Sequence, residues 1–246
     1  MLLNQRFLAL KTIYDFYDNY ICGFETACQA GCDVCCTNSV VATGLEIDYL
    51  ISSFPDKNPS SFLEFISNHL NNDIYRPGHT TNQIASFCLN QTAWDDNSTG
   101  VYGDGACPFL AEDGLCNVYD HRPFACRAMS SKLKCKKGNE ACMEPFLITV
   151  NLSLFQIIEH LDKKGFSGNM LDLIDVRSES QNKNKFLIKN LPFPGFIIPD
   201  EEKKRFDRFY KRFIRFKTSE TCIKDVLNAF KLNCSAENFA SAHEKK

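Results

Sequence analysis

Cysteine is the residue that most constrains this chain. The 246 residues include 13 cysteines, several times ordinary usage, and the odd count means that internal disulfides cannot pair all of them. Seven of these cysteines fall into two groups that lie far apart in the sequence. The fold must bury, pair or bind these thiols, and this requirement directs the other inferences.

The first group reads CQAGCDVCC and places four sulfurs within nine residues, 28–36. Cys28 and Cys32 are four residues apart and would share one face of a helix, whereas Cys32 and Cys35 have the two-residue gap that lets a tight turn aim both thiolates at one ion. The adjacent Cys35 and Cys36 point in different directions in any regular backbone. Either a second centre exists, or one thiol of this group is spare.

The second group consists of Cys107, Cys116 and Cys126, which are nine and ten residues apart. These gaps are too long for one turn, so the sulfurs converge only if the fold brings a loop, a short strand and a helix start together. Pro123 suits the first turn of a helix. Such a helix would place Cys126 near backbone N–H groups that favour a thiolate over a thiol.

Two arginines, Arg122 and Arg127, flank Cys126. A centre bound by four thiolates carries net negative charge, and nearby guanidinium groups would offset it. The equal alternative is that both arginines are solvated or paired with Asp120 and Glu112. The sequence leaves these two interpretations open.

The start of the chain, MLLNQRFLALKTIYDF, interrupts its apolar residues with polar and basic ones, unlike a secretory signal. No run approaches the roughly 18 apolar residues of a membrane span. These features predict a cytoplasmic protein without a membrane span, in a reducing compartment where clustered thiols bind metal or do chemistry. The net charge of -2 argues against a global attraction to nucleic acid.

The hydrophobic periodicity predicts a mainly α fold, a small helical domain with irregular cysteine-rich loops around a metal site. Residues 71–105 are predicted as a long polar loop with at most one short strand, and 176–185 as an exposed linker. We expect a cysteine-cluster metal-binding domain over 1–145 and a helical C-terminal extension packed on it over 146–246. Helices are predicted over residues 1–25, 45–51, 60–70 and 146–161, and from Pro199 or Asp200 onward.

The last of these helices combines aromatic and basic residues. Its aromatic face consists of Phe206, Phe209, Tyr210, Phe213 and Phe216, and its basic residues are Lys203, Lys204, Arg208, Lys211, Arg212 and Arg215. We predict that the aromatic side packs in the core and the charges face water. The alternative is that segment 203–217 binds a protein partner, RNA or a membrane surface.

The remaining cysteines carry weaker signals. Cys135 and Cys142 could complete a second site, although the sequence around them has the composition of an exposed segment. His121 is predicted to be an exposed turn residue rather than a ligand. Small buried apolar residues are the predicted role of Cys22, Cys88, Cys222 and Cys234.

The pair of motifs CxxxCxxCC and CPFL…GLCxVYxxRPxxCR resembles the YkgJ-type cysteine-cluster family of zinc- or iron-chelating domains, over roughly residues 25–130. The order of the two motifs, the Cys-Cys doublet and the Tyr-x-x-Arg-Pro element all agree. Flagellin lysine N-methylases are similar in carrying a related cysteine cluster, which implies an iron–sulfur centre and offers an enzymatic alternative. The resemblance implies metal chelation by Cys28, Cys32, Cys35, Cys36, Cys107, Cys116 and Cys126.

Zinc and iron–sulfur centres share thiolate ligands. The number of sulfurs and the scarcity of histidine favour a 4Fe-4S cluster over zinc. Three classes of function remain: a redox or structural metal-binding protein, a cluster-dependent group-transfer enzyme, and a zinc-stapled interaction module that uses segment 203–217. The enzyme would need a pocket, for which the candidate residues are Tyr119, Arg122, Asp104 and His121.

Overall fold

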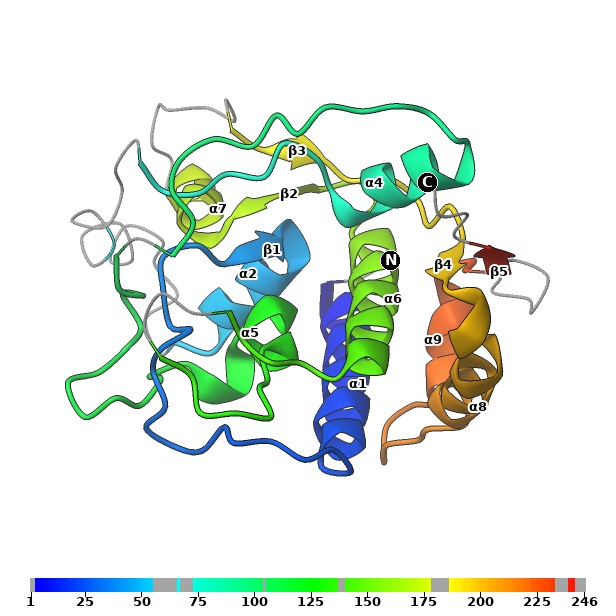
Figure 1. The fold of residues 1–246 in the computed structure, drawn as a ribbon, viewed down its shortest axis with the longest axis horizontal. Coiled ribbons are helices and arrows are strands. Elements are labelled where there is room, and N and C mark those ends of the chain that lie inside the picture. Colours follow the sequence, from blue (N-terminus) through cyan, green and yellow to red (C-terminus); the bar gives the residue numbers. More distant parts are fainter. Residues whose placement is uncertain are drawn as a thin grey trace.

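The computed structural model describes residues 3–54, 66, 73–103, 105–136, 140–177, 186–232 and 239–241 (Figure 1). In chain order its helices and strands are α1 (Leu3–Ile21), β1 (Val41–Thr43), α2 (Gly44–Ser52), α4 (Thr81–Leu89), η2 (Tyr119–His121), α5 (Phe124–Ala128), α6 (Pro145–Leu161), β2 (Phe166–Asn169), α7 (Met170–Arg177), β3 (Ile188–Lys189), β4 (Phe196–Ile198), η3 (Asp200–Glu202), α8 (Lys203–Ile214), α9 (Ile223–Ala229) and β5 (Phe239–Ser241).

Helices dominate the described residues, as the periodicity predicts. Four expected helices correspond to α1, α2, α6 and α8, the last preceded by the short η3. The helix expected over 60–70 lies outside the described residues apart from Ile66, and so does most of the linker expected over 176–185. None of the described helices is long and apolar enough to cross a bilayer. The division at residue 145 and the cytoplasmic location stay predictions.

The prediction of a continuous loop over 71–105 is wrong, because α4 lies within it. Thr80 caps this helix by accepting a hydrogen bond from the Gln83 amide, and the Gln83 side chain accepts one from the Thr80 amide in return. This Thr-x-x-Gln capping box was a local signal for a helix start that the polar composition obscured. The carboxylate of Glu159 on α6 accepts hydrogen bonds from the Thr80 hydroxyl and the Asn82 amide, both at 2.7 Å, and so fixes α4 against α6.

Two small sheets accompany the helices. Strand β2 pairs antiparallel with both β1 and β3, with Val41 opposite Asn169 and Phe166 opposite Lys189. Strands β4 and β5 form a parallel pair. The mainly α prediction therefore holds in outline, while the sheets depend on pairings between residues far apart in the sequence.

The described residues form two hydrophobic cores. The larger one lies among α1, α6, α8 and α9, where the rings of Phe16 and Phe213 pack with centroids 5.0 Å apart. The smaller one lies among β1, α2 and α7 and includes Phe109 and Val118 from the second cysteine segment. Cys107, Cys116 and Cys126 pack against this smaller core. Burial of apolar surface thus fixes the second cysteine segment on a rigid base.

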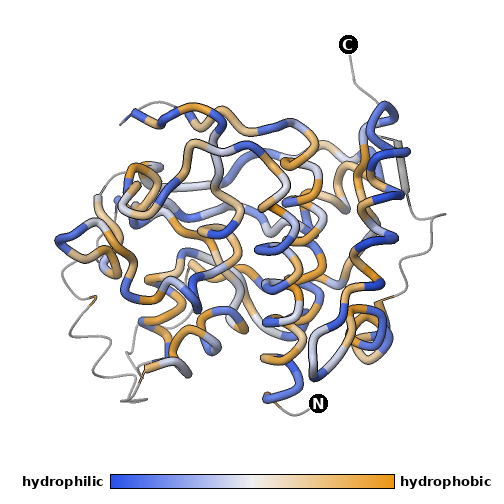
Figure 2. The backbone as a smooth tube through the Cα atoms, turned by 90° about the horizontal axis from the view of Figure 1, so that it is seen from below, coloured by the Kyte–Doolittle hydropathy of each residue, from blue (hydrophilic) through white to orange (hydrophobic). Residues whose placement is uncertain are grey.

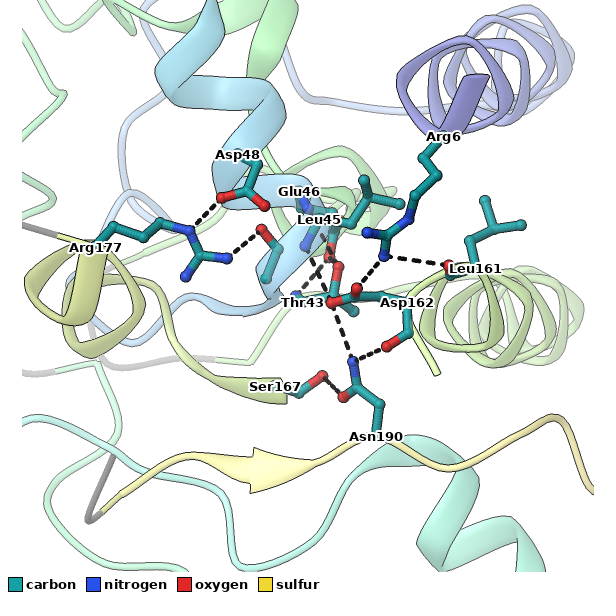
Figure 3. Close-up of polar contacts among 11 residues, drawn as sticks. Arg6, Thr43, Leu45, Glu46, Asp48, Leu161, Asp162, Ser167, Arg177 and Asn190 are labelled. Carbon is teal, nitrogen blue, oxygen red and sulfur yellow. Dashed lines mark hydrogen bonds and ion pairs between the residues drawn. The ribbon is translucent and has the colours of Figure 1, made fainter. Parts of the chain in front are cut away.

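A buried polar network joins α1 and the end of α6, from the larger core, to the start of α2 (Figure 3). Asp162, just beyond α6, forms an ion pair with Arg6 of α1 and accepts a hydrogen bond of 3.1 Å from the Leu45 amide at the start of α2. The Asn190 amide donates to the Asp162 carbonyl at 2.9 Å, and the Ser167 hydroxyl donates to Asn190 at 2.6 Å. Burial raises the pKa of Asp162, against the lowering effect of Arg6.

A second buried carboxylate, Glu46, fixes the helix that carries Cys126. One of its oxygens accepts hydrogen bonds from the Tyr14 hydroxyl at 2.8 Å and the Phe124 amide at 2.7 Å. The other accepts from the Thr43 amide and hydroxyl at 2.8 and 3.0 Å. Glu46 therefore connects α1, the start of α2 and the first residue of α5.

We expect Glu46→Gln to lower the free energy of unfolding by roughly 2 kcal/mol or more, because an amide has one acceptor oxygen and turns an NH₂ donor toward groups that themselves donate. Glu25→Gln, at an exposed glutamate, should change stability by less than about 0.5 kcal/mol. Urea unfolding followed by circular dichroism measures both. Equal midpoints for the two variants would contradict the role given to Glu46.

Candidate metal centre

The two cysteine segments meet through their backbones. Thr37 and Ala106 form an antiparallel bridge, and next to it the Cys107 amide donates a hydrogen bond to the Cys36 carbonyl at 3.0 Å. Because these residues are paired, Cys36 and Cys107 lie on adjacent stretches of chain although 70 residues separate them in sequence. Backbone hydrogen bonding therefore brings the first group of cysteines to the second.

The loop that carries Cys28 and Cys32 touches the turn that precedes Cys116. This turn passes through Gly114 at a φ of +78°, where an added Cβ would lie 3.4 Å from the Gly31 carbonyl oxygen. A side chain at Gly114 would thus be strained by its backbone conformation and would press on the opposite loop. Residues 22–40 contain no helix, so the expectation that Cys28 and Cys32 share a helical face is wrong.

Cys126 lies in α5, whose start is the N-cap residue Pro123, as the sequence predicts. The Cys126 amide donates to the Pro123 carbonyl at 3.0 Å. The expectation that the helix start favours the Cys126 thiolate is wrong, because burial is the largest effect and raises the pKa of this thiol. A helix of five residues provides only a weak dipole to oppose that burial.

Five of the predicted ligands lie close enough for a negative charge on one to shift the pKa of another. Negative charge on Cys35, Cys107 and Cys116 raises the pKa of Cys126, and charge on Cys107 and Cys126 raises that of Cys36. Burial raises the pKa of Cys107 to about 11, and a charge on Cys116 adds to this shift. The thiols of both cysteine segments therefore occupy one electrostatic neighbourhood.

The Cys-Cys doublet is asymmetric. Cys35 accepts a hydrogen bond from Cys36, and this bond lowers the pKa of Cys35 to about 6 against the opposing effect of burial. The same bond is the main cause that raises the pKa of Cys36. Cys35 is thus the more acidic thiol of the doublet, and Cys36 the one that holds its proton more strongly.

The thiols share this neighbourhood without standing at ligand distance of a common point. Among the residues that the structure describes, no group of three or more histidine, cysteine, aspartate and glutamate side chains is arranged to hold a metal ion. The described cysteines are all free thiols. Of the seven predicted ligands, Cys35, Cys36, Cys107, Cys116 and Cys126 interact electrostatically, while Cys28 and Cys32 lie on the adjoining loop, exposed and half-buried respectively.

Arg127 is neutralised by the protein itself. Its side chain is buried, forms an ion pair with Asp18 and donates a hydrogen bond to the Asp120 carbonyl. It also lies over the Tyr14 ring, with 4.2 Å from the guanidinium carbon to the ring centroid. The sequence left open whether the arginines offset the charge of the centre or are solvated or paired with carboxylates. Arg127 is paired, but the carboxylate that pairs with it belongs to Asp18 and not to Asp120 or Glu112.

Arg122 is different, because it faces the thiols. Its guanidinium lies 3.6 Å from the centroid of the Tyr119 ring, and its charge lowers the pKa of both Cys35 and Cys126. The Nε of Arg122 is buried and has no hydrogen-bond partner among the described residues. A buried donor beside a thiol cluster is available to an anionic group formed there.

The sequence does not decide whether Cys135 and Cys142 complete a second site. The structure places Cys142 near the first group. The Cys142 amide donates to the Ser131 hydroxyl at 3.0 Å, and the Ser131 carbonyl accepts from the Ala27 amide at 2.7 Å. Ser131 thus joins the chain around Cys28 to the chain around Cys142. Only a contact between distant segments could reveal this.

The expectation of buried apolar roles is wrong for Cys22 and Cys88, which are exposed, while Cys222 is half-buried. Cys234 lies outside the described residues. Both exposed cysteines occupy or adjoin the ends of helices α1 and α4, where few neighbours cover them.

Among the residues proposed to line an enzyme pocket, Arg122 lies over the Tyr119 ring, whereas His121 packs on Tyr49. Tyr119 is 58% exposed. The His121 ring packs 4.9 Å from the Tyr49 ring, and partial burial lowers the pKa of His121. His121 is thus half-buried, and the prediction that it is exposed is wrong. Asp104 lies outside the described residues.

Comparison with known proteins gives one match. Residues 27–143 match the family model CxxCxxCC, described as a putative zinc- or iron-chelating domain. No curated protein and no solved structure matches the chain. The matched range begins one residue before Cys28 and ends one residue after Cys142, so it contains all seven predicted ligands and also Cys135.

In reduced, metal-free protein we expect alkylation of Cys35 to accelerate up to about pH 7 and then level off, because its pKa is about 6. Cys107, with a pKa of about 11, should stay unreacted over this range. Iodoacetamide labelling followed by peptide mass spectrometry measures both rates. Cys36→Ala removes the hydrogen-bond donor and should move the Cys35 profile toward the ordinary value of about 8.5; an unchanged profile would show that the bond is not the cause.

Proposed function

We propose that this chain, whose residues 27–143 belong to the CxxCxxCC family of zinc- or iron-chelating domains, holds a 4Fe-4S cluster in a redox or structural role. The proposed ligands are Cys107, Cys116, Cys126 and one sulfur of the Cys35–Cys36 doublet. The observation that carries the proposal is the mutual electrostatic contact of these thiols where the two segments pair.

The chemistry of the donors fits such a centre. Four cysteine thiolates are the usual ligands of a 4Fe-4S cluster, and they also suit structural zinc. The excess of sulfurs favours the cluster, because a structural zinc site needs only four. His121, which is the histidine closest in sequence to the second group, packs on Tyr49 instead of facing the thiols.

The protein residues give the thiols a defined position. Backbone pairing places Cys36 beside Cys107, and Glu46 holds the start of α5, which carries Cys126. A cysteine has a single rotatable bond before its sulfur, so paired backbones allow convergence by side-chain rotation. When bound, a cluster supplies one-electron transfer and a covalent link between the two segments.

Because the thiols differ in pKa, we propose that they lose their protons in order as metal binds, Cys35 before Cys107 and Cys126. Cys35 has a lowered pKa, whereas Cys107 and Cys126 must release protons to become ligands. Affinity for metal should therefore increase with pH. Cys28 and Cys32, on the loop held against Gly114, remain proposed ligands of the same region and could serve a second centre.

Arg122 is proposed to offset the negative charge of the centre. Its buried Nε has no partner among the described residues, and its charge acts on Cys35 and Cys126. Arg127, by contrast, already has Asp18 as its counter-ion. The two arginines of the motif thus have different proposed roles, one electrostatic and one structural.

Anaerobically purified protein should be brown, with broad visible absorption and about four iron and four sulfide per chain. We expect Cys107→Ser and Cys126→Ser each to remove most of the iron, and Cys22→Ser and Cys88→Ser, at exposed cysteines outside the junction, to leave it unchanged. Absorption spectra and elemental analysis measure this. Colourless protein with stoichiometric zinc would overturn the cluster, and unchanged metal in the first two variants would overturn the ligands.

Arg122→Gln should lower the reduction potential of the cluster by roughly 20–40 mV, because a positive charge stabilises the more negative reduced state. Arg122→Lys keeps the charge and should retain most of the potential, while Lys164→Gln removes an exposed charge elsewhere and should have no effect. A spectroscopic redox titration compares them. Equal potentials for Arg122→Gln and wild type, at equal iron content, would refute the electrostatic role.

A further inference from the structure

The surface of α8 and the residues just after it form a strongly basic hollow on the side of the molecule away from α5 (Figure 1). The hollow has a volume of about 570 Å³ and is wide open to solvent. We call it the basic hollow. Its lining residues are Arg208, Lys211, Arg212, Arg215, Phe216 and Lys217.

The hydrophobic face of α8 forces these charges outward. Phe206, Phe209 and Phe213 are buried in the larger core, and their spacing of three and four residues places them on one side of the helix. Figure 2 shows hydrophilic and hydrophobic residues alternating along the helices at this end of the molecule. The predicted packing of the aromatic face is thus observed, and it leaves the basic face free for another role.

Only some of the basic residues have partners. Lys211 pairs with Asp207 at 2.6 Å, and Arg212 donates a hydrogen bond to the side-chain oxygen of Asn19 at 3.2 Å. Arg208, Arg215 and Lys217 form no ion pair with the described residues. Exposed cations near the C-terminus of a helix gain a modest interaction with its dipole. That gain does not explain why several positive charges are gathered around a single hollow.

We propose that the basic hollow binds an acidic segment of a partner protein through its carboxylates. Guanidinium groups match carboxylates in two-point hydrogen bonds. The hollow is too open to exclude water from a small ligand, whereas a protein partner would cover it with its own surface.

Two other polyanions fit less well. No large hydrophobic side chain of α8 is exposed in the described structure, so the helix offers nothing to insert into a membrane. Single-stranded nucleic acid stacks its bases on exposed aromatic rings. The aromatic residue of the hollow, Phe216, is half-buried and packs against the larger core.

The basic hollow lies apart from the cysteine junction, the place where residues 36–37 pair with residues 106–107. In Figure 1, α8 and α9 occupy one end of the molecule and α5 lies toward the other, with α1 and α6 between them. A partner bound at α8 would therefore leave the cysteine junction uncovered. The hollow recruits a partner and takes no part in holding the metal.

The test uses the full chain and three probes: a 20-residue poly-glutamate peptide, a single-stranded RNA of equal charge, and phosphatidylserine vesicles. We expect the peptide to bind most tightly at low salt, with an affinity that falls as salt screens the charges. Arg208→Gln/Arg215→Gln should weaken binding at least fivefold. The matched control Lys164→Gln/Lys189→Gln removes the same charge from exposed positions elsewhere and should bind as wild type does.

Each other outcome overturns the proposal. Tighter binding of RNA or vesicles would assign the hollow to a different class of partner, and equal losses in both double variants would show nonspecific attraction. Failure of all three probes to bind would also reject it. The thermal midpoint and metal content of each variant are measured alongside, and both should be unchanged because the substituted residues are exposed and none is a proposed ligand.

Discussion

The pairing of residues 36–37 with residues 106–107 is the constraint on which the candidate centre depends. A backbone hydrogen bond between Cys107 and Cys36 joins two stretches of chain that would otherwise be independent. Closing so long a loop costs conformational entropy, and the smaller hydrophobic core, which includes Phe109 and Val118, offsets that cost. Backbone pairing and packing of the smaller core therefore bring the two groups of thiols together.

Burial has two opposed effects at this junction. It raises the pKa of Cys107 and Cys126, which keeps their thiols neutral and limits repulsion among the sulfurs. The same low-polarity surroundings strengthen the attraction between thiolates and a cation once the protons have left. The Cys36 hydrogen bond makes Cys35 the exception, because it lowers the pKa of this thiol.

The molecule separates its two chemical surfaces. The helices α1 and α6 run through the larger core, with the cysteine segments toward one end and the basic face of α8 at the other (Figure 1). Because the aromatic side of α8 belongs to the core, its basic side is held at a fixed orientation. Because α1 and α6 lie between the two surfaces, the partner proposed for the basic hollow would not cover the cysteine segments.

The sequence by itself determined the features that depend on local pattern. Hydrophobic periodicity identified α1, α2, α6 and α8, and the two cysteine motifs indicated the family whose model matches residues 27–143. The missed helix α4 also had a local signal, the capping box at Thr80.

Only the tertiary structure decided what depends on neighbours distant in sequence. It paired Arg127 with Asp18 and left Arg122 facing the thiols, although the two arginines are equivalent in the motif. It made Cys88 exposed where a buried position was expected, and it surrounded Cys126 with enough protein for burial to raise its pKa against the expected effect of its helix. Burial and long-range pairing depend on which segments of the folded chain cover one another. These segments are distant in sequence, so a local pattern cannot predict which residues they bury or pair.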